Sequence, residues 1–321
     1  MAGKILVTPR SLTRGGHPAL GRLAEAGYEV VFCTMGEQPD EAELLTLVPD
    51  CVGYLAGVER ISAGVLRAAT SLKVISRNGT GVDKIDLAAA EECGVTICRA
   101  IGANARGVAE LALAGMLALV RAVPFSDAAI KAGAWERRKG IELEGRTLGL
   151  VGCGKIGRLV ATFALGLGMD VLAYDPYPDK GFAPPERFTY AELGRVLAEA
   201  DVVSLQCPPG PDGTPLLDGR AIAGMKPGVY IVNTARAELV DDAAALEAIE
   251  AGQVAGLATD VHRNEPPVER ALVASDRVIA TPHIGGYTDE SVTRAVEMAV
   301  DSMLTVLAGP ASREGRDDGI E

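Results

Sequence analysis

Three short segments late in the chain bring together a cation, a carboxylate and an imidazole, each a few residues after a predicted strand. The side chains are Arg236, Glu265 and His283. A guanidinium binds a carboxylate through two parallel hydrogen bonds, and an imidazole exchanges protons near neutral pH when a carboxylate orients it. Taken singly, an arginine after a strand is usually solvated and a lone histidine usually structural. Because ligands bind at the carboxyl ends of strands in an open α/β sheet, the joint placement indicates one site.

A glycine-rich loop earlier in the chain points to a dinucleotide. The predicted strand Thr147–Val151 is followed by Gly152-Cys153-Gly154-Lys155-Ile156-Gly157 and then by a predicted helix, whose N-terminus favours phosphate. Asp175 ends the next predicted strand, where a carboxylate accepts hydrogen bonds from the adenosine ribose hydroxyls and repels a 2′-phosphate. The combination predicts an NAD site rather than an NADP site.

The two sets of residues together define a reaction type. Hydride transfer to a 2-keto acid requires a cation for the carboxylate, a proton donor for the carbonyl oxygen and a group that orients this donor. Arg236, His283 and Glu265 have these chemical properties in that order.

Short β-branched runs alternate with helical stretches along most of the chain, which predicts parallel sheets covered on both faces. The predicted strands are Lys4–Val7, Glu29–Cys33, Cys51–Leu55, Lys73–Ser76, Val95–Cys98, Thr147–Val151, Asp170–Tyr174, Asp201–Leu205, Val229–Val232, Val254–Ala258 and Val278–Ala280. Predicted helices include Pro18–Ala26, Asp40–Thr46, Ser62–Ala69, Ile85–Glu92, a long apolar helix from Asn104 to about Arg121, and a last helix from Thr288 to Leu307. The tail Gly309–Glu321 is predicted to be disordered.

Length and charge exclude several classes of protein. A chain of 321 residues predicts two domains. Lys and Arg number 31 against 43 Asp and Glu, a net charge of −12 that argues against nucleic acid and anionic membranes as partners. The longest apolar run, Leu111–Val120, is too short to span a bilayer. Six scattered cysteines without metal-ligand spacing predict a cytoplasmic protein with reduced thiols and no metal site.

Several motifs together make the sequence similar to a known family. It resembles the D-2-hydroxyacid dehydrogenases, most closely their 3-phosphoglycerate dehydrogenase branch. The matching segments are Asn78-Gly79-Thr80-Gly81-Val82-Asp83, Val108-Ala109-Glu110-Leu111, Gly133-Ala134-Trp135-Glu136-Arg137, the glycine-rich loop, Met225-Lys226-Pro227-Gly228, Asn233-Thr234-Ala235-Arg236, Asp260-Val261 with Glu265-Pro266, and Pro282-His283-Ile284-Gly285-Gly286.

The resemblance implies an α/β fold of two doubly wound parallel-sheet domains. A Rossmann NAD-binding domain, residues 100–285, is inserted into a flavodoxin-like substrate domain made of residues 1–99 and 286–321. The Rossmann domain begins with the long helix, around which the family forms a homodimer.

The resemblance also implies the site residues. The catalytic residues are Arg236, Glu265 and His283. The cofactor residues are Gly152, Gly154, Lys155, Ile156, Gly157, Asp175, Cys207, Thr234, Ala235, Asp260, His283 and Gly285, with Asp260 holding the nicotinamide carboxamide. The substrate residues are Asn78, Gly79, Arg236 and His283, with the loop Asn78-Gly79-Thr80 binding the carboxylate and Arg60 or Arg77 available for a substrate phosphate.

Some positions depart from the family pattern and leave the substrate open. Asn78 replaces a small residue, Glu238 lies where the family commonly has glycine, and His262 replaces an aromatic residue as a packing substitute. The expected substrate is a small anionic 2-hydroxy or 2-keto acid, with 3-phosphoglycerate or a related phosphorylated or phosphonate acid as one possibility. Two alternatives use the same family fold, a phosphite-type dehydrogenase and a non-catalytic NAD-sensing co-repressor.

Overall fold

The computed structural model describes residues 2–268 and 270–309, which form two compact units. One unit combines the chain up to Asn104 with the C-terminal helix α12 (Asp289–Ala308), and the other spans Ala105–Thr288. The tail predicted to be disordered lies, from residue 310 onward, outside the described residues.

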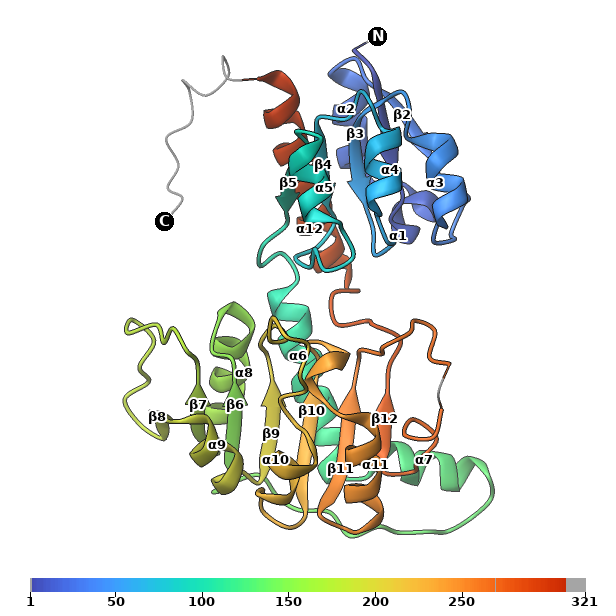
Figure 1. Ribbon diagram of the computed structural model, residues 1–321. Coiled ribbons are helices and arrows are strands. Elements are labelled where there is room, and N and C mark those ends of the chain that lie inside the picture. Colours follow the sequence, from blue (N-terminus) through green and yellow to red (C-terminus); the bar gives the residue numbers. More distant parts are fainter. Residues whose placement is uncertain (1, 269, 310–321) are drawn as a thin grey trace. The chain divides into compact units, whose positions relative to one another are not determined.

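The first unit is built on a parallel sheet of five strands in the order β2-β1-β3-β4-β5 (Figure 1). The strands are β1 (Lys4–Val7), β2 (Glu29–Phe32), β3 (Cys51–Ala56), β4 (Val74–Arg77) and β5 (Thr96–Arg99). The connecting helices are α1 (Arg10–Gly15), η1 (Pro18–Leu20), α2 (Gly21–Glu25), α3 (Glu41–Leu47), α4 (Ala63–Ala68) and α5 (Leu87–Glu92). This strand order is the flavodoxin-like one, and it places the strand ends of β1, β3 and β4 side by side.

Helix α12 belongs to the first unit because its apolar face packs on that sheet. Its buried residues recur every three to four positions, as an amphipathic helix requires. They are Ser291, Ala295, Val296, Ala299, Val300 and Met303. The buried Ser76 hydroxyl on β4 donates to the carbonyl of Ala299 at 2.8 Å, which fixes the helix to the sheet.

The second unit has a parallel sheet of seven strands in the order β12-β11-β10-β9-β6-β7-β8, the Rossmann order with one further strand (Figure 1). The strands are β6 (Thr147–Val151), β7 (Asp170–Tyr174), β8 (Phe188–Tyr190), β9 (Val202–Leu205), β10 (Val229–Asn233), β11 (Val254–Thr259) and β12 (Val278–Ala280). The helices are α6 (Ala105–Val120), α7 (Val123–Lys131), α8 (Lys155–Gly166), α9 (Leu193–Glu199), α10 (Gly219–Ala223), η2 (Ala237–Leu239) and α11 (Asp242–Glu250).

The prediction of two doubly wound parallel-sheet domains is confirmed, and every predicted strand is present to within a residue at each end. Strand β8 and helix α7 were not predicted. Strand β8 has only three residues at the edge of the sheet, and Phe188 packs edge-on against Phe182 at 5.3 Å between ring centroids. So short a run carries no recognisable period, and its position depends on this packing.

One face of the long apolar helix α6 is buried within its own unit, against α8, β10 and β11, while Ala114 and Leu117 on the helix are exposed. Gly115 allows the close approach, since a Cβ there would lie 3.1 Å from the Cβ of Ala258. Within the described part of the chain, no single helix is long and apolar enough to cross a membrane, although α6 and α7 taken together have the length and composition and are bent by 63°.

Candidate active site

The structure brings the predicted imidazole and carboxylate into direct contact. His283 Nδ1 lies 2.7 Å from Glu265 Oε1, and both side chains are partly exposed. An ionised carboxylate only accepts hydrogen bonds, so the pairing assigns the hydrogen to Nδ1. Nε2 is then the ring atom that can exchange a proton with a ligand.

A buried carboxylate holds the loop that carries His283. Asp260 Oδ1 accepts hydrogen bonds from Thr281 Oγ1 at 2.6 Å and from the backbone N–H of Ile284 at 2.8 Å, and Oδ2 accepts from the N–H of Gly285 at 2.7 Å. Asp260 is 2% exposed. His283 has a φ of 55°, a left-handed conformation that is uncommon outside glycine and that persists only where the surroundings enforce it. The carboxylate is therefore a positioning group for the imidazole, a role that sequence reasoning missed.

We expect Asp260→Asn to lower kcat by about 10²-fold, because an amide nitrogen would face the donors of this loop and displace the imidazole. The affinity for NADH, measured by calorimetric titration, should change little. The exposed Asp276 provides the matched control, Asp276→Asn. If affinity for NADH fell while kcat held, Asp260 would bind the cofactor, as the resemblance implies, without positioning His283.

The backbone around Arg236 is shaped by a second buried side chain, Asn233, at the end of β10. Asn233 is 2% exposed; its Nδ2 donates to the carbonyl of Arg236 at 2.8 Å, and its Oδ1 accepts from the N–H of Ala235 at 3.1 Å. The Arg236 guanidinium itself donates to the carbonyl of Ala235 at 2.7 Å through Nη1. An asparagine directly after a strand is a recognisable signal for such a turn, and it was available in the sequence.

The glycine-rich loop after β6 has the geometry that a pyrophosphate requires. Gly152 has a φ of 93°, and a Cβ on it would lie 2.6 Å from the backbone of Gln206 after β9. A Cβ on Gly157 would lie 2.1 Å from the carbonyl oxygen of Gly152. A Cβ on Gly154, which precedes α8, would meet no atom within 4 Å, so the backbone is open to a ligand at the helix N-terminus. Lys155 and Ile156 are the first residues of that helix.

The predicted ribose-binding carboxylate lies beside this loop. Asp175 Oδ2 accepts a hydrogen bond from the N–H of Cys153 at 2.7 Å, and Oδ1 accepts from the N–H of Tyr177 at 2.8 Å. Cys207 follows β9, the strand that pairs with β6 on the other side. Burial raises the pKa of its thiol to about 11, so this side chain is uncharged at neutral pH. Gln206 Nε2 donates to Thr234 Oγ1 at 2.9 Å and links the two strand ends that follow β9 and β10.

In the first unit, the predicted carboxylate-binding loop is held through its carbonyl groups. The carbonyls of Gly79, Thr80 and Gly81 accept hydrogen bonds from Ala100 N–H at 3.0 Å, Arg99 Nε at 2.7 Å and Arg77 Nε at 2.7 Å, in that order. Across residues 2–268 and 270–309, no acceptor contacts the N–H groups of Gly79 and Thr80. The loop therefore presents two backbone donors.

The two arginines proposed for a substrate phosphate differ in their surroundings. Arg77 is 9% exposed, and besides Gly81 its guanidinium contacts the carbonyl of Ala56, with Nη1 at 3.1 Å. It supports the loop from within the unit, as does Arg99, which the sequence analysis did not select. Arg60 is exposed.

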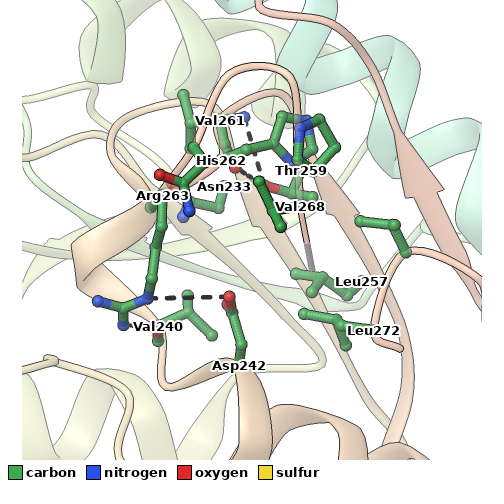
Figure 2. Close-up of a pocket in the computed structure, with 14 residues that line it drawn as sticks. Asn233, Val240, Asp242, Leu257, Thr259, Val261, His262, Arg263, Val268 and Leu272 are labelled. Carbon is green, nitrogen blue, oxygen red and sulfur yellow. Dashed lines mark hydrogen bonds and ion pairs between the residues drawn. The ribbon is translucent and has the colours of Figure 1, made fainter. Parts of the chain in front are cut away.

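A cavity of about 110 Å³ lies in the second unit, at the ends of β10 and β11 (Figure 2). It is lined by Asn233 and Thr259 at the ends of β10 and β11, and by His262 and Arg263 of the following loop. Arg263 contacts Asp242, with Nε 3.8 Å from Oδ2, and donates to the carbonyl of Val240 at 3.1 Å. His262 Nε2 lies 3.0 Å from the carbonyl oxygen of Thr281. Among the described residues, no group of His, Cys, Asp and Glu side chains is arranged to hold a metal ion.

Comparison with known proteins identifies the family. Residues 113–285 match the family described as D-isomer specific 2-hydroxyacid dehydrogenase, NAD binding domain. The chain is 39% identical over 274 residues to D-3-phosphoglycerate dehydrogenase of Mycobacterium tuberculosis, covering 84% of this chain and 52% of that protein. The chain belongs to the D-2-hydroxyacid dehydrogenase family. The family prediction and the prediction of an NAD-binding Rossmann domain are thereby confirmed.

Other proteins similar to the chain carry different names. Hydroxypyruvate reductase of Thermotoga maritima is also 39% identical, over 80% of this chain and 85% of its own length. The TT0316 protein of Thermus thermophilus superimposes with a TM-score of 0.86 at 38% identity, covering 95% of this chain and 97% of that one. D-lactate dehydrogenase of Aquifex aeolicus, complexed with NAD and lactic acid, gives 0.82 at 27% identity and covers 95% and 96% of the two chains. The chain spans about half the length of the phosphoglycerate dehydrogenases that it matches.

Proposed function

We propose that this family member is an NAD-dependent D-2-hydroxyacid dehydrogenase, which interconverts a small 2-hydroxy acid and its 2-keto acid. The observation that carries the proposal is the 2.7 Å contact between His283 and Glu265 on an NAD-binding domain. In the same domain, Arg236 follows β10, the strand next to β11.

Bound NADH would supply the hydride to C2 of the keto acid. His283 Nε2 protonates the carbonyl oxygen as it gains charge, and in the reverse direction the same atom accepts the proton from the hydroxyl. Glu265 keeps the imidazole in the tautomer that allows this and stabilises the charged form. Arg236 binds the carboxylate and polarises the carbonyl. The N–H groups of Gly79 and Thr80 would add to carboxylate binding, as the family resemblance implies.

The test is a spectrophotometric screen of NADH oxidation with small 2-keto acids, with and without a phosphate or phosphonate group. The proposal predicts turnover with at least one acid and a D-hydroxy acid as product. Silence with every acid, despite tight NADH binding, would contradict the proposal and favour the NAD-sensing alternative. Turnover of NAD with phosphite alone would favour the phosphite-type dehydrogenase.

We expect Asp175→Ala to weaken binding of NAD by about tenfold while binding of NADP weakens less or improves. The variant loses charge-assisted hydrogen bonds to the ribose and the repulsion of a 2′-phosphate. The ratio of the two dissociation constants measures this directly. Asp170→Ala, an exposed residue at the other end of the same strand, is the control. An unchanged ratio would mean that Asp175 does not select the cofactor.

We also propose, as the family resemblance implies, that the first unit determines substrate specificity. We further propose that two copies of the chain form a homodimer. Support for the dimer comes from apolar side chains exposed on and after α7, namely Val123, Ile130 and Trp135. Light scattering would then give twice the chain mass of 33.3 kDa.

A further inference from the structure

At the carboxyl ends of β3 and β4, beside the proposed carboxylate loop, the first unit contains a buried acidic side chain. Glu59 is 3% exposed. Its Oε1 accepts hydrogen bonds from Tyr54 Oη at 2.8 Å, from the N–H of Gly57 at 2.9 Å and from the hydroxyl of Thr8. All three donors are neutral groups, so none of these contacts brings a positive charge to the carboxylate.

Glu59 also occupies the space that another residue would need. A Cβ on Gly57 would lie 2.7 Å from Glu59 Oε2, so no larger side chain can stand at position 57 without displacing the carboxylate. Early in this loop, after β3, the buried side chain is therefore an acidic one, whose oxygens accept hydrogen bonds. This is the opposite of what a phosphate dianion requires.

The neighbouring loop adds an unpaired acceptor. Asn78 Oδ1 is buried and, among the described residues, receives no hydrogen bond. Buried polar atoms in native proteins are nearly always paired, and an exception calls for a ligand or another specific explanation. The two features are linked through one residue, because the N–H of Asn78 donates to the carbonyl of Ala56 at 3.0 Å and Ala56 precedes Gly57.

The position of Asn78 indicates which part of a ligand would reach it. It directly precedes Gly79 and Thr80, whose N–H groups are proposed to bind the carboxylate. In a 2-keto acid, C3 is only two bonds from the carboxylate carbon, so a side chain on the neighbouring residue is near enough to contact the substituent on C3. A hydrogen-bond acceptor such as Asn78 Oδ1 recognises the hydrogen of a hydroxyl group. A phosphate at neutral pH instead presents its own acceptor oxygens, which the oxygens of Asn78 and Glu59 do not pair with.

We propose that Asn78 and Glu59 determine specificity for a 2-keto or 2-hydroxy acid that carries an unphosphorylated hydroxyl on C3. Asn78 Oδ1 accepts the hydrogen bond of that hydroxyl, and the Glu59 carboxylate excludes the phosphate ester. The inference rests on the proposed dehydrogenase function and names its substrate class. The relatives do not decide this question, since a phosphoglycerate dehydrogenase and a hydroxypyruvate reductase are equally similar to the chain.

The experiment compares kcat/KM for three acids with NADH: hydroxypyruvate, its phosphate ester and pyruvate, which lacks the hydroxyl. The wild-type chain should favour hydroxypyruvate over both others by about tenfold or more, the value of one net hydrogen bond. In Asn78→Ala the ratio of hydroxypyruvate to pyruvate should fall by about tenfold. Asn78→Asp retains an acceptor and should keep that ratio, which a merely structural role for the amide does not predict.

A second variant tests the electrostatic part. Glu59→Gln keeps the shape of the side chain and removes its charge, so the ratio of the phosphate ester to hydroxypyruvate should rise several-fold. Glu91→Gln, an exposed residue on α5, is the charge-matched control and should leave the ratio unchanged. Thermal melting of each variant establishes that the folded fraction is the same in all assays.

Two results would overturn the inference and leave the proposed function standing. One is a wild-type preference for the phosphate ester, and the other is an unchanged ratio of hydroxypyruvate to pyruvate in Asn78→Ala. A wild-type chain that is silent with all three acids and every other 2-keto acid would contradict the proposed function itself, and with it this inference.

Discussion

His283→Ala should lower kcat by about 10³-fold, within the range that a positioned acid–base group contributes. The variant removes the imidazole nitrogen that is proposed to protonate the substrate oxygen, while the glycine-rich loop and Asp175 stay as they are. NADH should therefore still bind, as calorimetric titration would show.

The appropriate control is His17→Ala, in the first unit, where the imidazole Nδ1 accepts a hydrogen bond from the N–H of Ala19 at 3.2 Å. It removes an imidazole from a helix cap and should leave kcat unchanged. Retained turnover at neutral pH in His283→Ala would remove the imidazole from the mechanism.

Arg236→Ala should lower kcat/KM by about 10²- to 10³-fold, with both a higher KM for the acid and a lower kcat. The guanidinium is expected to bind the carboxylate in the ground state and to stabilise the charge that develops on the carbonyl oxygen. Arg236→Lys should recover little of the loss, because an ammonium group cannot form two parallel hydrogen bonds to a carboxylate.

Arg220→Ala, an exposed position on α10 of the same unit, is the matched control for loss of positive charge. An unchanged KM for the acid in Arg236→Ala would place substrate binding elsewhere. Equal recovery by lysine would show that charge alone is sufficient.

The arrangement of Glu265 and His283 was predictable because it follows from topology. Both residues come after strands of a parallel sheet, and the carboxyl ends of such strands meet at one edge. The glycine-rich loop was predictable for a similar reason, since Gly152 and Gly157 stand where any side chain would collide with backbone.

The roles of Asp260 and Arg77 could not be predicted, because they depend on burial and on partners distant in the chain. Asp260 binds a loop that begins twenty-one residues later at Thr281, and no local pattern marks that pairing. Arg77 is the last residue of β4 and Arg236 comes shortly after β10, yet the Arg77 side chain turns inward to the carbonyls of Ala56 and Gly81. A charged residue after a strand gives no indication of the direction its side chain takes.

The buried pair of acceptors, Glu59 and Asn78, illustrates the same limit. In the sequence, Glu59 is one acidic residue in a turn, and Asn78 is a residue that replaces a small one in the family pattern. Among the residues that the structure describes, the Asn78 oxygen instead has no hydrogen-bond partner, and Glu59 accepts hydrogen bonds from neutral donors. Specificity in this account therefore comes from contacts within the first unit rather than from the motif that identifies the family.

The most direct test of the central claim follows the hydride itself. The protein would be supplied with a 2-keto acid and NADH deuterated at the reactive carbon of the nicotinamide, and the product would be examined by mass spectrometry and chiral chromatography. The account predicts deuterium at C2 of a D-2-hydroxy acid, formed in equal amount to the NADH consumed. NADH consumption without deuterium at C2, or an L-hydroxy acid as product, would contradict it.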